Sequence, residues 1–464
     1  MRVDKRIAIK TDGEVQVTYG ELRREVQKLS KEMECRQVAV IVCSNTLGCI
    51  YCYLACLKRK VVPLLLPENI SGEQLGHCLD TYGAKYLCMP FEETVQAIRS
   101  KSKHLCKERA ISIYDYMIYE REAASASVHK DLTLLLTTSG STGGSRCVRL
   151  SRKNVIQNTR AICESLKIQS SDRAITSLPL NYTYGLSVLH THLYRGATVL
   201  LTNKTVLSRD FWTFFDNEEG TSFAGVPFMY ECLYKLGVFK ERHKSLQVLT
   251  QAGGKLNLSL QKYYGELAEQ YGYRFYIMYG QTEATARMSY LPYQEVLKRQ
   301  GSVGVPICGG KFEIISDEIV YYGDNVSMGY AESKEELCLG DSNQGILHTG
   351  DLGYIKEGFL YVTGRKDRMI KINGVRISLS ELEEYLQQTF HREVICIMKK
   401  DILYYVHEES FSECEWQEIL LWTKEKLPIL SGHLVDMPVK RISRTSSGKV
   451  NYVQLEHLCR EKRL

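Results

Sequence analysis

The sequence predicts an α/β fold with a large N-terminal domain of mixed sheets and helices, which includes a β subdomain, and a small α+β C-terminal domain. Continuous apolar segments at 37–43 and 61–66 alternate with helical patterns, as expected for parallel strands that are buried on both faces. From residue 301 this alternation gives way to short β segments, which indicate the β subdomain. A charged segment at 364–368 then precedes a second mixture of helices and strands, so we expect a domain boundary there.

The first 130 residues contain helices whose starts are marked by capping signals. Thr18 with Glu21, and Ser71 with Gln74, match the capping box, in which side chains satisfy the free backbone N–H groups of the first turn. We therefore expect helices from these points, and a third helix that carries cysteines between the two apolar strands. A strand at 84–89 closes this part of the chain.

Helices and strands alternate again after residue 150, and polar turns follow several strands. The expected helices are 154–166, 186–194 and 209–217, and the expected strands are 174–178, 197–202, 222–226, 246–249 and 274–278. Glycine-rich or polar turns follow the strands that end at 136, 249 and 278. Ligands bind at the carboxyl ends of strands in open α/β sheets, so these turns are candidates for one shared crevice, although each glycine could equally well only end its strand.

The elements expected beyond residue 301 are shorter. They are β segments at 311–315, 318–322 and 358–364, a turn at 373–374, a helix from 380, strands at 394–398 and 403–406, a helix at 415–425 and a polar loop at 443–449. The part after residue 367 has the size of an ordinary small domain.

The composition excludes several classes of protein. Only 25% of the 464 residues are charged and the formal net charge is +6, with both signs interspersed, so we expect no nucleic-acid partner. The apolar run 48–57 ends at three basic residues and is too short to span a bilayer. No apolar segment follows the charged N-terminus, so we expect no signal peptide, no stable membrane insertion and a cytoplasmic location.

Sixteen cysteines raise the question of disulfides or metal binding. Cys49, Cys52 and Cys56 share one helical face and resemble half of a zinc site. No second Cys/His pair with suitable spacing completes it, so we expect reduced thiols that pack as small hydrophobic side chains.

The stretch 137–146 has the composition of a loop that binds an oxyanion or a polyphosphate. Its glycines allow successive N–H groups to point inward, its Ser and Thr hydroxyls add donors, and Arg146 adds a permanent planar cation. It is not a Walker loop, because no lysine follows Gly143 or Gly144. Taken alone, the stretch is an ordinary polar connection about as often as a binding loop.

Five motifs in order give this stretch a context. The sequence contains Thr138-Ser139-Gly140-Ser141-Thr142-Gly143, Tyr279-Gly280-Gln281-Thr282-Glu283, His348-Thr349-Gly350-Asp351, Gly364-Arg365-Lys366-Asp367 and Thr445-Ser446-Ser447-Gly448-Lys449. This series is similar to the adenylate-forming, or AMP-binding, superfamily of acyl-CoA synthetases, nonribosomal peptide synthetase adenylation domains and luciferases. The pattern is nearest to stand-alone acyl-CoA or acyl-carrier-protein ligases. The resemblance implies an adenylation domain at 1–366 and a mobile C-terminal domain at 367–464.

The resemblance also implies a reaction and its residues. ATP with Mg²⁺ would activate a carboxylic acid as an acyl-adenylate, and a thiol of CoA or phosphopantetheine would then accept the acyl group. Lys449 would stabilise charge during adenylation, Glu283 would be the Mg²⁺ ligand, and Arg146 would take the place of the usual loop lysine. The nucleotide site would comprise Thr138, Ser139, Gly140, Ser141, Thr142 and Gly143 at the phosphates, Gly253, Gly254 and Tyr279 at adenine, Asp351 and Arg365 at ribose, and Gly280 and Thr282.

The segment 179–186 resembles the acyl-pocket motif Pro-Leu-Phe-His-x-Tyr-Gly-Leu of the acyl ligases. Tyr182 and Tyr184 would form an aromatic wall of the substrate pocket. Amino-acid-activating members carry an Asp where this chain has Gly185, and that Asp pairs with the substrate ammonium. Gly185 therefore favours an uncharged acyl or aryl group over an α-amino acid.

Three functions remain open at this point. The chain is a stand-alone acid–thiol ligase that loads CoA or a separate acyl carrier protein, an amino-acid adenylation enzyme, or a silent binding or scaffold protein. The family usually has Pro-Lys-Gly where this chain has Ser145-Arg146-Cys147, which puts catalytic efficiency in doubt. The retained Glu283, Asp351 and Lys449 favour an enzyme.

The two half-reactions of the family require different groups at one site. Lys449 would serve adenylation, and the face formed by 371–376 would serve thiol entry. Both lie beyond Asp367, so we expect Asp367 to be the hinge about which the C-terminal domain rotates. The identity and chain length of the acid, and the oligomeric state, do not follow from the sequence.

Overall fold

The computed structural model describes residues 3–91, 110–121, 126–137, 146–372, 375–390, 392–399, 402–408, 410–426, 434–445 and 448–461. Contacts divide the chain into two compact units. The first comprises Met1–Lys311 and Tyr321–Leu347, and the second comprises Phe312–Val320 and His348–Leu464. The boundary expected between residues 366 and 367 stays a prediction, since the second unit of this division begins earlier in the chain.

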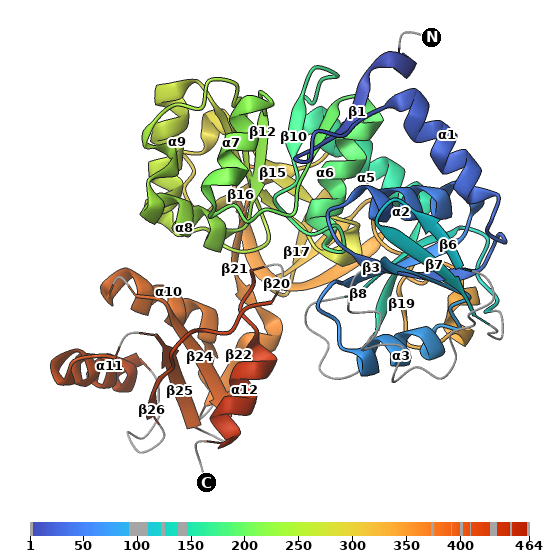
Figure 1. The fold of residues 1–464 in the computed structure, drawn as a ribbon. Coiled ribbons are helices and arrows are strands. Elements are labelled where there is room, and N and C mark those ends of the chain that lie inside the picture. Colours follow the sequence, from blue (N-terminus) through green and yellow to red (C-terminus); the bar gives the residue numbers. More distant parts are fainter. Residues whose placement is uncertain are drawn as a thin grey trace. The chain divides into compact units, whose positions relative to one another are not determined.

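The predicted α/β fold is confirmed, and its first sheet is buried on both faces (Figure 1). The strand order is β19-β9-β8-β4-β3-β5-β7-β6, with β3 (Val38–Cys43) between the parallel strands β4 (Val62–Pro67) and β5 (Tyr86–Pro90). Successive residues of β3 belong to different core clusters, one packed with α2 (Leu47–Arg59) and the other with α3 (Gly72–Thr81). This is the arrangement that a continuous apolar strand predicts.

The described residues of this part of the unit form six further elements. They are α1 (Tyr19–Ser30), β6 (Ala110–Ile113), β7 (Tyr116–Glu120), β8 (Leu132–Thr137), β9 (Cys147–Ser151) and β19 (Tyr330–Ala331). Thr18 and Ser71 form the two capping boxes that the sequence predicts.

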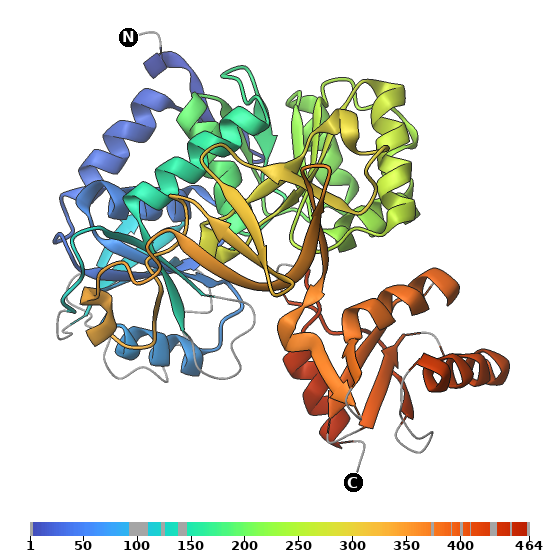
Figure 2. The same ribbon diagram turned by 180° about the vertical axis from the view of Figure 1, so that it is seen from behind.

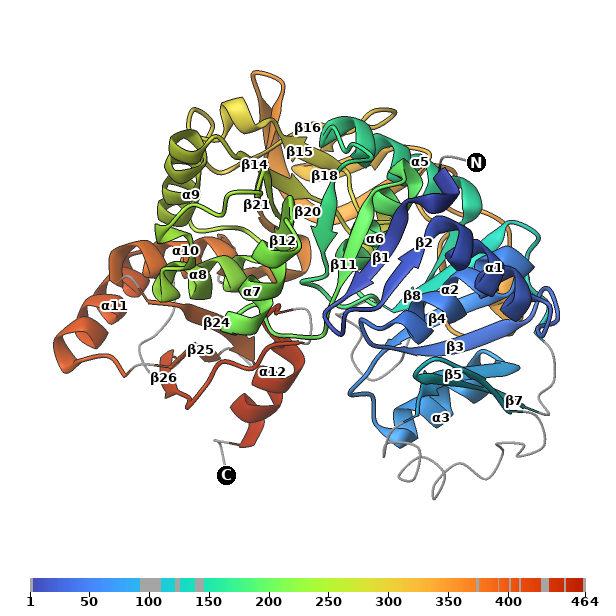
Figure 3. The same ribbon diagram turned by 45° about the horizontal axis from the view of Figure 1, so that its top comes forward.

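A second sheet of the first unit carries most of the remaining motifs. Its strands in this unit follow the order β16-β15-β14-β13-β12-β10-β11-β1-β2. The central strands are parallel, and β1 lies beside β11 at one side, as Figure 3 shows. Their bounds are β1 (Ile7–Thr11), β2 (Gln16–Thr18), β10 (Arg173–Ile175), β11 (Thr198–Leu201), β12 (Ser222–Gly225), β13 (Val248–Gln251), β14 (Arg274–Tyr279), β15 (Ser289–Leu291) and β16 (Ser302–Pro306).

Helices connect these strands. They are α5 (Arg152–Ser165), α6 (Thr183–Arg195), α7 (Arg209–Asn217), α8 (Pro227–Leu236) and α9 (Leu258–Tyr271). The short helices are η1 (Val3–Lys5), η2 (Val238–Lys240), η3 (Thr282–Ala284), η4 (Tyr293–Glu295) and η5 (Glu335–Cys338).

The second unit begins with short β segments and ends in the predicted α+β arrangement (Figure 2, orange to red). Two expected segments coincide with β17 (Lys311–Ile315) and β18 (Glu318–Tyr322), and β20 (Ile346–Lys356) pairs antiparallel with β21 (Phe359–Arg365). The remaining elements are η6 (Lys366–Arg368), β22 (Met369–Ile372), β23 (Val375–Ser378), α10 (Leu379–Phe390), β24 (Val394–Lys399), β25 (Ile402–His407), α11 (Glu413–Lys426), β26 (Leu434–Pro438) and α12 (Tyr452–Glu461).

The cysteine pattern of α2 is structural. Cys49, Cys52 and Cys56 are buried, and burial raises the pKa of the Cys52 and Cys56 thiols. In the described part of the chain, no group of three or more His, Cys, Asp or Glu side chains could hold a metal ion. Among the same residues, every helix is too short or too polar to cross a membrane.

Candidate active site

The predicted phosphate loop closes a hairpin between β8 and β9. Thr137 at the end of β8 pairs with Cys147 at the start of β9, and Arg146 immediately precedes that pair. The loop residues Thr138, Ser139, Gly140, Ser141, Thr142 and Gly143 lie outside the described residues, so their roles stay predictions.

The structure brings two predicted catalytic residues, Arg146 and Glu283, to a common neighbour. The Tyr330 hydroxyl on β19 donates a hydrogen bond of 2.8 Å to Glu283 Oε1. The guanidinium carbon of Arg146 lies 4.0 Å from the centre of the same Tyr330 ring. A planar guanidinium can stack on an aromatic ring in this way, so the arginine has a contact that the usual lysine would make less well. A cation and a carboxylate therefore contact the same tyrosine, one through its ring and the other through its hydroxyl.

The loop that carries Glu283 has a strained backbone. Thr285 has φ of 67° and ψ of −60°, and the Ala286 N–H donates to the Ala284 carbonyl at 2.8 Å, which defines a γ-turn of the rare, strained kind. A Cβ atom on Gly280 would lie 1.8 Å from the Ala286 carbonyl oxygen, so only glycine allows the chain to pass itself here. The motif residues Tyr279 and Thr282 lie on this loop, half-buried.

Buried asparagines hold this loop in place. Asn325, 4% exposed, donates from Nδ2 to the carbonyl oxygens of Ala284 at 2.9 Å and of Arg287 at 3.0 Å. Asn158 on α5 also donates to the Arg287 carbonyl, at 2.8 Å. The Thr285 hydroxyl donates to the Asn325 carbonyl at 2.7 Å. The shape of the loop thus depends on groups that are distant in sequence, and neither asparagine belongs to a motif.

The glycine turn after β13 lies against the predicted acyl-pocket segment. Gly253 has φ of +89°, and a Cβ atom there would lie 2.4 Å from the Tyr182 hydroxyl. A Cβ atom on Gly254 would come within 3.2 Å of Pro227. Glycine at 253 is thus required by its backbone angle and by the tyrosine; its predicted contact with adenine stays a prediction.

Tyr182 and Tyr184 form an aromatic corner with ring centres 6.3 Å apart at 75°. The hydroxyl groups of Tyr184 and Thr250 lie 2.7 Å apart, within hydrogen-bond distance. Burial raises the pKa of Tyr182 to about 12 and also raises that of Tyr184, so both phenols are neutral at pH 7. The guanidinium of Arg287 lies over the Tyr184 ring, with its carbon 4.7 Å from the ring centre.

Packing gives Gly185 a reason that the sequence does not show. The residue lies in the first turn of α6, where a Cβ atom would meet the Pro179 carbonyl oxygen at 2.4 Å and the Leu178 carbonyl oxygen at 3.0 Å. Glycine is required because the helix packs on the preceding backbone, and it does not open space for a substrate. The absence of an Asp at this position is unchanged, so the expectation that the acid carries no α-ammonium stays a prediction.

The ribose residues expected from the sequence pair with each other in the second unit. Asp351 and Arg365 are partners in the β20–β21 register, with Arg365 Nη1 3.4 Å from Asp351 Oδ1. The aspartate is 5% exposed and the arginine side chain is half exposed. An incoming diol could use the oxygens of such a carboxylate, but the pair alone also fits a structural ion pair, so both roles stay predictions.

The hinge region joins this hairpin to the rest of the second unit. Asp367 is exposed and lies 3.3 Å from Arg365 Nε. The next residue, Arg368, pairs with Glu383 on α10 at 2.8 Å and stacks over the Tyr452 ring of α12 at 4.4 Å. Arg368 is therefore anchored in the packed part of the unit, whereas Asp367 is not buried.

Lys449 lies in a short turn before α12. Its carbonyl oxygen accepts a hydrogen bond of 2.8 Å from the Thr445 N–H, and the Asn451 N–H donates to the Ser443 carbonyl at 2.8 Å. The turn closes on itself, with Gly448 at φ of +79°. The thiol-entry face expected at 371–376 is the β22–β23 hairpin, where Lys371 pairs with Arg376, and its turn 373–374 lies outside the described residues.

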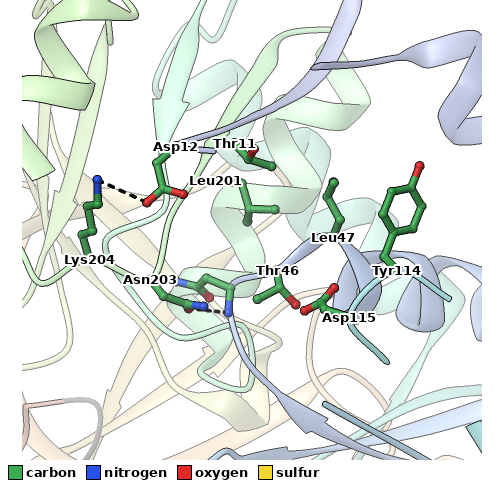
Figure 4. Close-up of a pocket in the computed structure, with 10 residues that line it drawn as sticks. Thr11, Asp12, Thr46, Leu47, Tyr114, Asp115, Leu201, Asn203 and Lys204 are labelled. Atoms are coloured by element: carbon green, nitrogen blue, oxygen red, sulfur yellow. Dashed lines mark hydrogen bonds and ion pairs between the residues drawn. The ribbon is translucent and has the colours of Figure 1, made fainter. Parts of the chain in front are cut away.

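A large pocket of the described residues lies away from the motifs. It has a volume of about 780 Å³ and opens at the ends of β1, β3 and β11, as Figure 4 shows. Its acidic groups are already engaged: Asp12 accepts from Thr202 Oγ1 at 2.6 Å and lies 3.8 Å from Lys204, and Asp115 accepts from the Gly48 N–H at 2.9 Å. None of the motif residues that the structure describes lines this pocket, so the assignment of the chemistry to the residues around Glu283 stays a prediction.

The chain is similar in sequence to known CoA ligases. Curated relatives include the 2-succinylbenzoate–CoA ligase of Bacillus subtilis, 27% identical over 395 residues that cover 80% of this chain and 77% of the relative. A probable CoA ligase of Humulus lupulus is 25% identical over 416 residues, which cover 82% of this chain and 78% of the relative.

Solved structures share the fold. The o-succinylbenzoate CoA synthetase of Bacillus subtilis in complex with an acyl-adenylate intermediate has a TM-score of 0.77 and 24% identity, and covers 97% of this chain and 95% of its own. An anthranilate CoA ligase in complex with anthranoyl-AMP has a TM-score of 0.76 and 18% identity. The match covers 98% of this chain and 94% of the ligase. The family model described as AMP-binding enzyme matches residues 2–331. The chain therefore belongs to the AMP-binding enzyme family, as the five motifs predict.

Proposed function

We propose that this chain is an AMP-forming acid–thiol ligase that activates a small carboxylic acid with ATP and transfers the acyl group to CoA. The observation that carries the proposal is the arrangement of Arg146 and Glu283 around Tyr330, in a chain of the AMP-binding enzyme family. Adenylation needs a cation and a metal-binding carboxylate close together, because charge accumulates on the leaving pyrophosphate.

In the first half-reaction a carboxylate oxygen of the acid attacks the α-phosphorus of ATP. The bond from that phosphorus to the bridging oxygen breaks, and pyrophosphate leaves with the electron pair. Arg146 binds the phosphates and Lys449 stabilises the charge at the reacting centre. Both roles rest on the family motifs.

Glu283 fits a magnesium site. Mg²⁺ in nucleotide sites is held by one or two carboxylates together with phosphate oxygens, and Glu283 is a half-buried carboxylate whose Oε1 is oriented by Tyr330. When bound there, the ion would neutralise part of the triphosphate charge.

In the second half-reaction the thiol loses its proton to solvent and its sulfur attacks the acyl carbon. The bond from that carbon to the adenylate oxygen breaks, a thioester forms and AMP leaves. We propose CoA as the acceptor because the relatives are named CoA ligases. A separate acyl carrier protein is the alternative, and the cytoplasmic location expected from the sequence is part of the proposal.

The absence of an Asp at position 185 is one argument against the amino-acid alternative. A different observation also disfavours it. Arg287 is a buried cation beside Tyr184, and a substrate ammonium placed near it would be repelled.

The test is ATP–pyrophosphate exchange by the purified full chain with a panel of acids: 2-succinylbenzoate, benzoate, hexanoate and several α-amino acids. We expect exchange with at least one carboxylic acid, loss of exchange when Mg²⁺ is chelated, and thioester formation when CoA is added. Glu283→Gln is the matched control and should lose exchange while keeping the fold. Exchange with no acid of the panel would contradict the proposal, and exchange with amino acids alone would favour the alternative.

A further inference from the structure

Arg287 is a buried cation without a counter-charge. The residue is 3% exposed, and its Nε is fully buried with no hydrogen-bond partner. For the described residues, the structure records neither a hydrogen bond nor an ion pair of its guanidinium. The charge lies over the Tyr184 ring, and burial lowers the pKa of the arginine.

Such a group costs free energy in the folded protein. A buried charge without a partner is strongly destabilising, and arginine cannot escape the cost by losing its proton under ordinary conditions. The neighbouring phenols of Tyr182 and Tyr184 do not compensate, because their pKa values are raised and they carry no charge at pH 7. A cation–π contact returns about 2 kcal/mol when it is desolvated, less than a lost ion pair costs.

The guanidinium borders a small cavity of the acyl-pocket region. The cavity has a volume of about 30 Å³. Many of its lining side chains are apolar, and its polar ones include Arg287, Tyr184 and Thr250, and Ser187 and Thr191 of α6. This volume suits a small polar group and is too small for a whole acid. The cavity therefore has room for one end of an acid and not for the whole molecule.

The only carboxylate that lines this cavity among the described residues is Asp172. Its Oδ2 accepts a hydrogen bond of 2.9 Å from the Gln169 N–H. No ion pair joins it to Arg287, and the groups that act on the charge of Arg287 are the two tyrosines. Asp172 thus leaves the arginine without a partner.

We infer that Arg287 binds a second anionic group, a carboxylate, at the far end of the acid substrate. The inference rests on the proposed function, since it gives that reaction a substrate class: acids that carry two carboxylates. A guanidinium binds a carboxylate with two parallel hydrogen bonds, which would satisfy the buried Nε and supply the missing charge. This differs from the uncharged acyl or aryl group expected from the sequence, because Arg287 belongs to no motif.

The test compares diacids with isosteres in which a methyl-branched end replaces the second carboxylate. Suitable pairs are adipate with 6-methylheptanoate, and 2-succinylbenzoate with each of two isosteres, 2-(4-methylpentanoyl)benzoate and 4-oxo-4-(2-isopropylphenyl)butanoate, because its two carboxylates are not equivalent. We expect kcat/KM in ATP–pyrophosphate exchange to favour at least one diacid over its isostere by about 10²-fold or more, because a site built to bond a polar group rejects the analogue without it. The wild-type comparison needs no variant and decides the matter even where a variant fails to fold.

Arg287→Met removes the charge and keeps most of the length. It should reduce the preference for the diacid to about onefold, whereas Arg287→Lys, which keeps the charge but not the fork, should retain an intermediate preference. Arg160→Met is the matched control, since Arg160 is exposed on α5 and bonds only the Tyr194 hydroxyl at 3.1 Å. The control should leave the preference unchanged.

Stability separates binding from a structural role. Because the wild-type charge is unpaired, Arg287→Met should have an equal or higher Tm in the absence of ligand. A lower Tm together with a retained preference for diacids would overturn the inference and make Arg287 structural. Equal use of both members of every pair by the wild type would overturn it and leave the proposed function intact, whereas exchange with no acid would remove both.

Discussion

The loop 279–287 and the turn 443–451 carry predicted catalytic residues in opposite ways. The loop around Glu283 depends on the buried Asn325 and Asn158, which come from distant parts of the sequence. The turn around Lys449 is closed by its own backbone hydrogen bonds. The loop around Glu283 is thus fixed by the core of its unit, whereas the turn around Lys449 keeps its shape through its own hydrogen bonds. A site for phosphates and metal needs the former, and a charge that serves only one of two half-reactions suits the latter.

Removing the lysine should give the largest effect. Lys449→Ala should slow acyl-adenylate formation by about 10²–10³-fold, equivalent to roughly 2.7–4 kcal/mol, because one charge-stabilising contact is lost. Thioester formation from preformed adenylate should be nearly unchanged. Single-turnover kinetics of each half-reaction measure this, and equal losses in both steps would contradict the division of labour.

Restricting the hinge should affect the other step. Asp367→Pro fixes φ near −65° and removes an N–H, so we expect it to preserve ATP–pyrophosphate exchange and to slow thioester formation by about 10²-fold. Asp367→Ala is the control, because it removes the contact with Arg365 without restricting the backbone. A proline variant that runs both steps at wild-type rates would place the hinge elsewhere.

Breaking the support of the loop should cost stability as well as activity. Asn325→Ala leaves buried carbonyl groups with fewer partners, so we expect a loss of about 1–3 kcal/mol in the free energy of unfolding together with reduced exchange. Asn451→Ala is the matched variant in the turn, where the side chain accepts only from the Gln454 N–H at 3.2 Å. Denaturant unfolding of both variants checks this, and an equal loss in the two would remove the contrast.

The smallest effect concerns the tyrosine between the two charges. Tyr330→Phe removes the hydrogen bond to Glu283 and keeps the ring under Arg146, so we expect a loss of about 0.5–1.5 kcal/mol, or up to about tenfold in exchange. Tyr194→Phe, at an exposed position, is the control. No change in the Mg²⁺ dependence of Tyr330→Phe would show that the hydroxyl does not orient Glu283.

The sequence predicts the parts of the fold that local patterns determine. The apolar strands β3 and β4 and the capped helices α1 and α3 are where the pattern puts them. Helices α8 and α9 are absent from the prediction, although Pro227 begins the first and Gly237 ends it, which are ordinary helix-end signals. Helix α6 begins before the predicted residue 186, because its N-cap Tyr182 makes no side-chain cap that a sequence pattern could reveal.

The site was predictable only where motifs exist. Glu283 and Arg146 stand in motifs, but Tyr330 is 47 residues from Glu283 and belongs to none. Asn325 and Arg287 act through burial and through contacts across the fold, which no local spacing encodes. Gly185 stands in a motif, but the packing of α6 on the preceding backbone, which also requires glycine there, does not show in the sequence.

The contacts of Arg368 determine which parts of the second unit would move together in the proposed rotation. Arg368 is tied to Glu383 on α10 and to Tyr452 on α12, and Tyr452 follows closely on Lys449. In a rotation about Asp367, the contacts of Arg368 with Glu383 and Tyr452 would move α12 and the adjoining turn of Lys449. A hinge at Asp367 would therefore carry the Lys449 turn along with the chain beyond it.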